Sequence, residues 1–170
     1  MDIEVAKGDA DDVDLLAPLW KAMVEHHRSV AADDWPVREQ ELSWDLRQRE
    51  YRKWLEDSTG FLLIARTGNV EAPVGYAFGR LMASGPTFDL GGIRGEVESL
   101  VVAADVRSHG VGTALLDACR DELRRRGCGY WSVSVMEANA GAVQLYERLG
   151  FRPWIREMLG HLDERTEGQS

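Results

Sequence analysis

Short strand-like and helix-like segments alternate along the chain, and this order constrains the fold more than any other feature. Alternating or continuous apolar residues predict strands at 3–5, 61–66, 74–78, 96–102, 130–135 and 151–159. Apolar residues at helical spacing predict helices at 12–27, 37–56, 111–126 and from Asn139 to Gly150, the second being one helix or two shorter ones. The interleaving predicts a mixed α/β sheet with helices on both faces.

The composition is that of a globular protein with a negative surface. Of the 170 residues, 44% are hydrophobic and 29% are charged, which suffices for one domain with a buried core. We expect a single domain over residues 1–160, followed by a polar tail at 161–170. The formal charge of −9 argues against a broad basic surface, so nucleic acid is not an expected partner.

Membrane insertion, secretion and metal binding find no support in the sequence. The longest fully apolar run, Phe61–Ala65, is far shorter than the ~20 residues of a membrane span, and the acidic N-terminus lacks an apolar leader. Cys119 and Cys128 match no zinc or redox spacing, and the adjacent His26 and His27 point apart on a helix. We expect two reduced thiols, no metal and no membrane partner in a cytoplasmic protein.

The segment Val101–Leu116 carries a glycine-rich turn between a predicted strand and a predicted helix. Gly110 and Gly112 stand where the helix begins, and Arg107 precedes them. Free backbone N–H groups and the positive end of the helix dipole bind phosphate at such a place, and glycine lets the phosphate approach closely. The segment lacks the lysine of a P-loop and the third glycine of a dinucleotide fingerprint. Alone, it is compatible with either an anion site or a tight strand–helix turn.

A second segment, one strand downstream, favours the anion site over the simple turn. Asn139, Ala142, Tyr146, Gly150 and Phe151 follow the spacing Asn-x-x-Ala-x-x-x-Tyr-x-x-x-Gly-Phe on a predicted helix. Upstream, the loop at 107–112 reads Arg-x-x-Gly-x-Gly and the strand at 98–102 reads Glu-x-Leu-x-Val. In this order and at this separation, the segments resemble the GNAT superfamily of acetyl-coenzyme A-dependent N-acetyltransferases, over about residues 96–152.

The resemblance implies a fold and a coenzyme site. The fold would be a largely antiparallel sheet with one splayed parallel pair, and the splay would admit the pantetheine arm. That arm would hydrogen-bond as an added strand along Leu100, Val101 and Val102, and Asn139 would help to fix the coenzyme near its thioester. The pyrophosphate would lie on the loop that comprises Arg107, Ser108, His109, Gly110, Val111, Gly112 and Thr113. His109 would be an exposed loop side chain and not a base.

The chemistry of amine acetylation points to three side chains. An alkyl amine with a pKa near ~10.4 is mostly protonated at neutral pH, so a base must accept its proton. Glu96 and Glu98 are the candidates, because residues two apart on a strand point to the same face. Glu98 ranks first because it is nearer the thioester end, although either glutamate could simply pair with an arginine such as Arg80. By resemblance, Tyr146 would donate a proton or hydrogen bond to the leaving sulfur.

The resemblance also divides the chain into an acceptor side at 1–60 and an acetyl-CoA-binding core at 96–152. Residues 1–60 contain 15 acids and 8 bases, a net charge of −7, whereas residues 61–170 have a net charge of −2. Residues 24–46 alone carry a net charge of −4. We therefore expect the acceptor to be a small cationic molecule or a peptide with an amine, attracted by this acidic stretch.

Other readings of the same motifs remain open at this stage. The acyl group could differ from acetyl, or the domain could bind acyl-CoA as a non-catalytic sensor. The oxyanion could be met by a backbone N–H of Val101 or of Val102. A homodimer is a further expectation, because symmetric pairs are the commonest oligomers.

Overall fold

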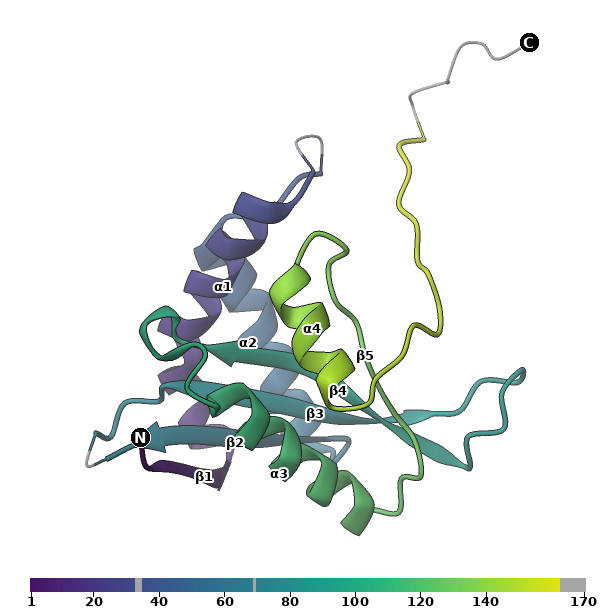
Figure 1. Cartoon of the computed structure of the whole chain (residues 1–170), viewed down its shortest axis with the longest axis horizontal. Coiled ribbons are helices and arrows are strands. Elements are labelled where there is room, and N and C mark those ends of the chain that lie inside the picture. Colours follow the sequence, from purple (N-terminus) through teal and green to yellow (C-terminus); the bar gives the residue numbers. More distant parts are fainter. Residues whose placement is uncertain (33–34, 69, 163–170) are drawn as a thin grey trace.

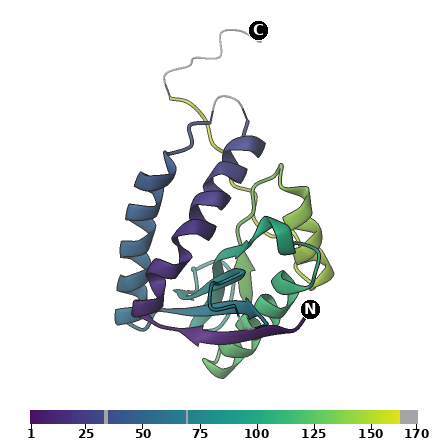
Figure 2. The same cartoon turned by 90° about the vertical axis from the view of Figure 1, so that its left-hand side faces the viewer.

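The computed structural model describes residues 1–32, 35–68 and 70–162, in which a twisted sheet lies between two layers of helices (Figures 1 and 2). The elements in chain order are β1 (Ile3–Gly8), the 3-10 helix η1 (Ala10–Leu16), α1 (Ala17–Val30), α2 (Gln40–Glu56), β2 (Gly60–Thr67), β3 (Gly75–Ala83), β4 (Ile93–Val102), the 3-10 helix η2 (Ala104–Val106), α3 (Val111–Arg125), β5 (Trp131–Val133) and α4 (Ala140–Arg148).

The five strands follow the order β1-β2-β3-β4-β5. The first four are antiparallel neighbours, and β5 pairs in parallel with β4 after the crossover through α3. Only residues 95–97 of β4 pair with 131–133 of β5, so the ladder ends while β4 continues to Val102. The predicted mixed sheet with one splayed parallel pair is therefore confirmed.

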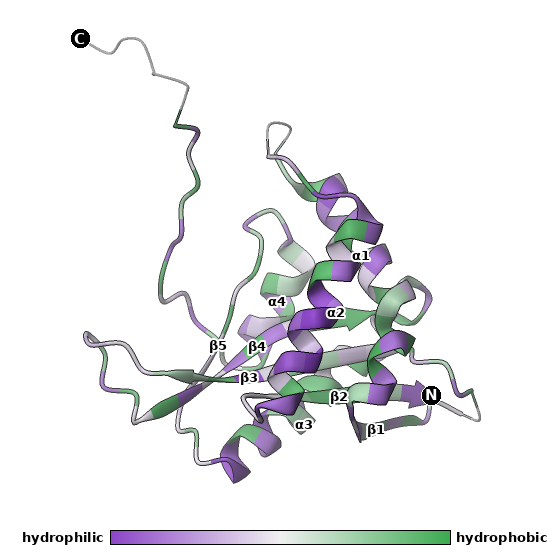
Figure 3. Ribbon diagram, turned by 180° about the vertical axis from the view of Figure 1, so that it is seen from behind, coloured by the Kyte–Doolittle hydropathy of each residue, from purple (hydrophilic) through white to green (hydrophobic). Residues whose placement is uncertain are grey.

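The two helical layers bury opposite faces of the sheet, as the edge-on view shows (Figure 2). On one face, apolar side chains of η1, α1 and α2 meet the sheet through Trp20, Tyr51, Tyr76 and Phe78. On the other face, α3 and α4 pack on the sheet through residues such as Leu115 and Tyr146. Seen from behind, the outer surface of α2 is hydrophilic, as expected for a helix with one buried face (Figure 3).

The first helical region divides into two helices at Pro18. Asp9 caps η1 with a capping box, in which its side chain accepts from Asp11 N and the Asp12 side chain accepts from Asp9 N. Pro18 occupies the first turn of α1, where a missing N–H costs no helical hydrogen bond. The helix expected over 12–27 is thus a 3-10 turn followed by a longer α-helix.

Several expected boundaries shift, and one expected element is wrong. The region 37–56 forms a single helix that begins at Gln40, and the strand expected at 130–135 is confined to 131–133. No strand forms in the described part of 151–159: Pro153 lacks the N–H that a ladder needs, and residues 152–162 are exposed. This segment instead runs away from the sheet (Figure 1). Most of the expected polar tail, 163–170, lies outside the described residues.

Both cysteines are enclosed by the fold. Cys119 and Cys128 are free and buried, and burial raises the pKa of the Cys119 thiol to about 12. Neither is therefore a reactive thiolate.

Among the described helices, none is long and apolar enough to cross a membrane.

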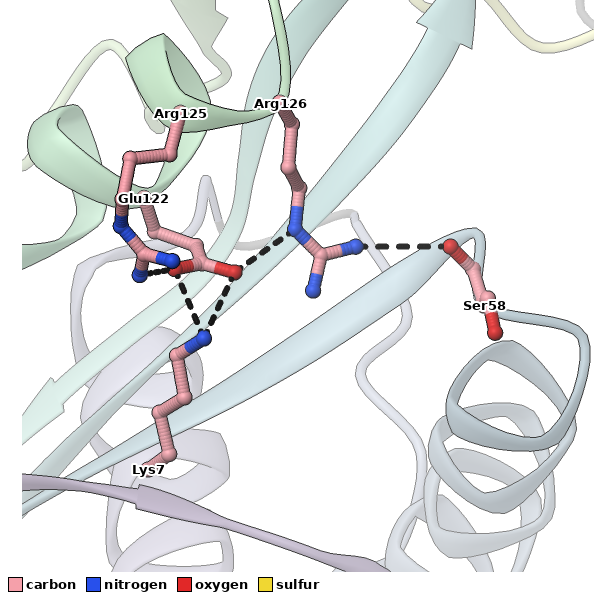
Figure 4. Close-up of polar contacts among 5 residues, drawn as sticks. All are labelled: Lys7, Ser58, Glu122, Arg125 and Arg126. Atoms are coloured by element: carbon pink, nitrogen blue, oxygen red, sulfur yellow. Dashed lines mark hydrogen bonds and ion pairs between the residues drawn. The ribbon is translucent and has the colours of Figure 1, made fainter.

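A buried carboxylate fastens α3 to the rest of the fold (Figure 4). Glu122 of α3 is only 2% exposed. It accepts from Lys7 Nζ of β1 at 3.0 Å and from Arg126 Nε at 2.8 Å, and it forms an ion pair with Arg125. Arg126 Nη1 reaches on to the carbonyl oxygen of Ser58, at the turn before β2. One carboxylate thus connects α3, whose first turn carries the glycine loop, to two distant segments of the chain.

Replacing this carboxylate should weaken the fold measurably. Glu122→Gln keeps the shape but removes the charge that three cations share, so we expect a loss of about 1–3 kcal/mol in the free energy of unfolding, from urea titrations at pH 7. The partial exposure of the cations keeps the loss below that of a fully buried broken pair. Asp121→Asn, at an exposed ion pair of the same helix, is the matched control and should cost less than about 0.5 kcal/mol. Equal effects of the two variants would contradict the assigned role of Glu122.

Candidate active site

The glycine loop before α3 has the backbone geometry of an anion site. Gly110 is the N-cap of α3 and has φ of +87°, in the left-handed region that glycine adopts without strain. No side chain caps this helix. The first intrahelical bond is donated by Ala114 N to Gly110 O at 2.9 Å, so the N–H groups of residues 111–113 stay available. With the dipole of a 15-residue helix behind them, these groups can hold a phosphate.

Gly112 lies where α3 packs closely against α4 and β4. A Cβ on Gly112 would lie 3.1 Å from Cδ2 of Leu145 in α4 and 3.8 Å from Cγ2 of Val102 in β4. A side chain at this position would require Leu145 to move by a few tenths of an ångström, whereas its contact with Val102 would be ordinary. Arg107 and His109 are exposed beside the loop, with Arg107 Nε 3.4 Å from Val102 O and His109 Nδ1 2.9 Å from Arg107 O.

The end of β4 has an open backbone edge facing the splay. Ala103 N donates to Val74 O before β3, and residues along an antiparallel ladder face their partner strand alternately. Leu100 and Val102 therefore turn their N–H and C=O groups away from β3, toward the side where the pairing with β5 has ended at Val97. Val101 faces β3. Of the two oxyanion donors expected from the sequence, the geometry favours Val102.

A β-bulge at Glu98 sets which side chains face which layer. Phe78 pairs with Ser99 and Gly79 pairs with Val97, which leaves Glu98 without a partner on β3. Ser99 accepts a hydrogen bond from the Tyr51 hydroxyl on the α2 side, whereas Leu100 packs against the α3 side. Without the bulge, strict alternation would place Leu100 on the same face as the two glutamates. The bulge thus separates the carboxylates from the apolar side chains at the open edge.

Glu98 is held by Arg47 of α2, a residue that sequence reasoning missed. Arg47 Nη1 lies 2.7 Å from Glu98 Oε1 and 3.3 Å from Glu50 Oε2. Its guanidinium also lies over the ring of Trp20, 4.9 Å from the centroid. Nothing in the local spacing of α2 signals this pairing, because Arg47 and Glu98 lie 51 residues apart.

Glu96 is the less firmly paired of the two carboxylates. It lies 3.7 Å from Arg94 Nη1, which also donates to Ser132 Oγ. Burial, and next the neighbouring Glu98 carboxylate, raise the pKa of Glu96 above its usual value. A carboxyl with a raised pKa and a loose partner is the better proton acceptor. Glu96 thus combines a raised pKa with an ion partner that is 3.7 Å away, whereas Glu98 has a close one.

Tyr146 and Asn139 lie on α4, on the opposite side of the sheet from the glutamates. Tyr146 is 8% exposed and belongs to the same apolar cluster against which Leu100 and Val102 pack. Its hydroxyl has no hydrogen-bond partner among the described residues, and burial raises its pKa to about 12. Asn139 caps α4, with Oδ1 accepting from Ala142 N at 3.3 Å, which leaves its NH₂ group free.

Three large aromatic side chains have structural roles. Trp20, Trp44 and Tyr51 are buried in the core between α1, α2 and the sheet. The described residues contain no group of three or more His, Cys, Asp or Glu side chains that could hold a metal ion.

Comparison with known proteins gives a family and several relatives. Residues 20–151 match the Acetyltransferase (GNAT) family. A mycothiol acetyltransferase of Thermobispora bispora is 37% identical over 120 residues, which are 69% of this chain and 39% of that protein. The [ribosomal protein bS18]-alanine N-acetyltransferase of Escherichia coli K12 is 42% identical over 53 residues, 31% of this chain and 36% of that protein. The chain thus spans about two fifths of the length of the mycothiol acetyltransferase.

Solved structures share the fold over nearly the whole chain. A GCN5-related N-acetyltransferase from Ralstonia eutropha superimposes with a TM-score of 0.69 at 23% identity, covering 94% of this chain and 99% of that one. A protein from Clostridium acetobutylicum described as a predicted acetyltransferase, crystallised with acetyl-CoA, gives a TM-score of 0.74 at 17% identity, covering 97% of this chain and 99% of that one. At these identities the likeness establishes the fold alone.

Proposed function

Because this chain belongs to the Acetyltransferase (GNAT) family, we propose that it transfers the acetyl group of acetyl-CoA to an amine of a small molecule or a peptide. The observation that carries the proposal is the open backbone edge of β4 beside the uncapped start of α3. Two relatives support an amine or similar acceptor, since their names refer to mycothiol and to an alanine of ribosomal protein bS18.

The coenzyme would enter from the α3 side of the sheet. Its pyrophosphate would accept from the N–H groups of 111–113, with Arg107 adding positive charge beside the loop. The pantetheine arm would continue the sheet by hydrogen bonds to Leu100 and Val102, the two residues whose backbone groups face the splay. The free NH₂ of Asn139 is available to a carbonyl of that arm. The core 96–152 would thus be the coenzyme half of a single domain, 1–160.

The acceptor would approach from the α1 and α2 side. The amine nitrogen attacks the thioester carbonyl carbon, and its proton passes to Glu96 through water. The oxyanion is met by a backbone N–H of the open edge of β4 that the arm leaves free, and the carbon–sulfur bond then breaks to give the amide and the coenzyme thiolate. Glu98, held by Arg47, helps to raise the pKa of Glu96. The same chemistry could carry a different acyl group.

Tyr146 would stabilise the leaving sulfur mainly as a hydrogen-bond donor. Its pKa of about 12 keeps the phenol protonated at neutral pH. A thiol has a pKa near ~8.5, so complete transfer of the phenolic proton would be uphill by about 5 kcal/mol. A hydrogen bond from the hydroxyl to the departing thiolate avoids that cost and still stabilises the negative charge.

The acidic helices favour a cationic acceptor. Glu25, Glu39, Glu41 and Asp45 are exposed on or next to α1 and α2, while Asp33–Asp34 of the same stretch lie outside the described residues. Of these four, Glu25 and Glu41 form ion pairs with Arg28 and Lys21, which leaves part of the negative charge to attract an ammonium group. A cytoplasmic location and a homodimer stay predictions of the sequence.

The direct test is thiol release from acetyl-CoA in the presence of a panel of small amines and peptides. We expect amine-dependent release of the coenzyme thiol together with a product heavier than the amine by one acetyl group, measured by a thiol reagent and by mass spectrometry. Binding of acetyl-CoA with no amine-dependent release across the panel would support the alternative of a non-catalytic acyl-CoA sensor.

Removal of the Tyr146 hydroxyl should slow turnover more than it weakens coenzyme binding. Tyr146→Phe keeps the packing against Phe151 but removes the hydrogen bond to the leaving sulfur. We expect kcat to fall about 10- to 100-fold, with the Kd of acetyl-CoA changed less than threefold, roughly. Unchanged turnover would remove this residue from the mechanism.

The pH profile should identify the base. Glu96 must be deprotonated to accept a proton, so kcat/KM should rise with pH through a pKa above the ordinary glutamate value. Glu96→Gln should abolish that limb and lower kcat by about 10²- to 10⁴-fold. Glu98→Gln removes the neighbouring negative charge, so the limb should move to lower pH but persist. If Glu98→Gln abolishes the limb and Glu96→Gln keeps it, the original ranking from the sequence holds.

A further inference from the structure

Arg80 is an arginine of the acceptor face that lacks an ion partner. It lies on β3 directly opposite Glu96 of β4, so both side chains are on the α2 side of the sheet. Among the described residues, no carboxylate oxygen lies within 4.0 Å of its nitrogens. Its Nε is buried and has no hydrogen-bond partner there. An unpaired buried donor on a charged group is costly and calls for a physical explanation.

The surroundings hold the guanidinium in place but leave its hydrogen-bonding edge unused. The Arg80 guanidinium carbon lies 3.9 Å from the centroid of the Trp54 ring, so the group is stacked on an aromatic face. Asp57, an acidic residue whose pKa Arg80 helps to lower, is already hydrogen-bonded to the backbone and hydroxyl of Thr59. Stacking fixes the plane of the guanidinium, and its Nη groups, which have no hydrogen-bond partner among the described residues, can bind a ligand in that plane.

The other two arginines on this face are already engaged. Arg47 holds Glu98 at 2.7 Å, and Arg94 donates to Ser132 and lies 3.7 Å from Glu96. Of these three arginines, Arg80 is thus the one without a carboxylate oxygen within 4.0 Å among the described residues. It lies within cross-strand distance of the proposed base.

We propose that Arg80 binds a carboxylate of the acceptor, so that the acceptor is an amino acid or a similar amino-carboxylate whose amine meets Glu96. The inference rests on the proposed acetyl transfer and narrows its substrate class. A planar guanidinium forms two parallel hydrogen bonds with a carboxylate, which gives both binding energy and orientation. Cross-strand partners on one face have Cβ atoms ~4.5–5.5 Å apart, which is close enough for one small molecule to engage both residues. Acids on α1 and α2 would attract the ammonium end of the same zwitterion.

The test compares amino acids with their primary amides as acetyl acceptors. Each pair differs in the carboxylate alone, and steady-state kinetics with acetyl-CoA give kcat/KM for both members with wild type and Arg80→Gln. The ratio of wild type to variant cancels the different basicity of the two amines. Arg80→Lys keeps the charge but loses the fork of N–H groups. Arg124→Gln, at an exposed residue of α3, is the control for loss of one positive charge far from this face.

We expect Arg80→Gln to raise the KM of the amino acid about 10- to 100-fold and to change that of the amide less than threefold, roughly. Arg80→Lys should recover part of the loss, and Arg124→Gln should leave both values unchanged. An equal effect of Arg80→Gln on acid and amide, with a melting temperature like that of wild type, would assign Arg80 a structural role and overturn the proposal.

A binding measurement keeps this proposal separate from the proposed function. If no amine releases the thiol, acetyl transfer fails, and Arg80 is then tested by saturation-transfer NMR with N-acetyl amino acids and their amides in the presence of coenzyme A. Selective binding of the acids to wild type, lost in Arg80→Gln, supports a carboxylate site. Equal signals from acids and amides, or signals that survive in the variant, overturn it.

Discussion

The rest of the site depends on how β4 is paired along its two edges. On one edge it pairs with β3 over its whole length, whereas on the other it pairs with β5 over 95–97 only. Backbone N–H and C=O groups cannot be left dry and unpaired without a cost of kilocalories, so an open edge in the middle of a sheet is stable only with water or a ligand beside it. The short β5 therefore creates a place that an extended, amide-bearing molecule can complete.

The bulge at Glu98 places the carboxylates of β4 and the apolar side chains at its end on opposite faces of the sheet. In a regular strand, Glu96, Glu98, Leu100 and Val102 would all face one way. The additional residue turns Leu100 and Val102 to the α3 face, where the start of α3 carries free N–H groups, and leaves the two carboxylates on the α2 face. The helix start proposed for the pyrophosphate and the carboxylate proposed as the base thereby lie on opposite sides of one strand. If the two shared a face, the positive end of the helix would lower the pKa of the carboxylate, and the carboxylate would repel a phosphate.

The local parts of this arrangement were predictable from sequence, because short-range patterns determine them. Gly110 at a helix start and Asn139 as the N-cap of α4 follow from local backbone chemistry, and both are confirmed. The roles of Arg47 and Arg80 were not predictable, since each depends on a partner that only the folded sheet brings near. The strand expected at 151–159 is wrong for a related reason: its apolar residues suggest a buried strand, but only Phe151 packs on the core, and the apolar residues after Pro153 are exposed.

Burial of the two thiols bears on the order of the chemical steps. A two-step route, in which the enzyme is first acetylated, needs an accessible nucleophile with a low pKa. Cys119 is 0% exposed with a pKa of about 12, and Cys128 is 9% exposed with its pKa raised by burial. Burial and a raised pKa therefore make both thiols poor acceptors of an acetyl group at neutral pH. Coenzyme on the α3 side and amine on the α2 side would instead meet through the splay, which favours direct attack in a ternary complex.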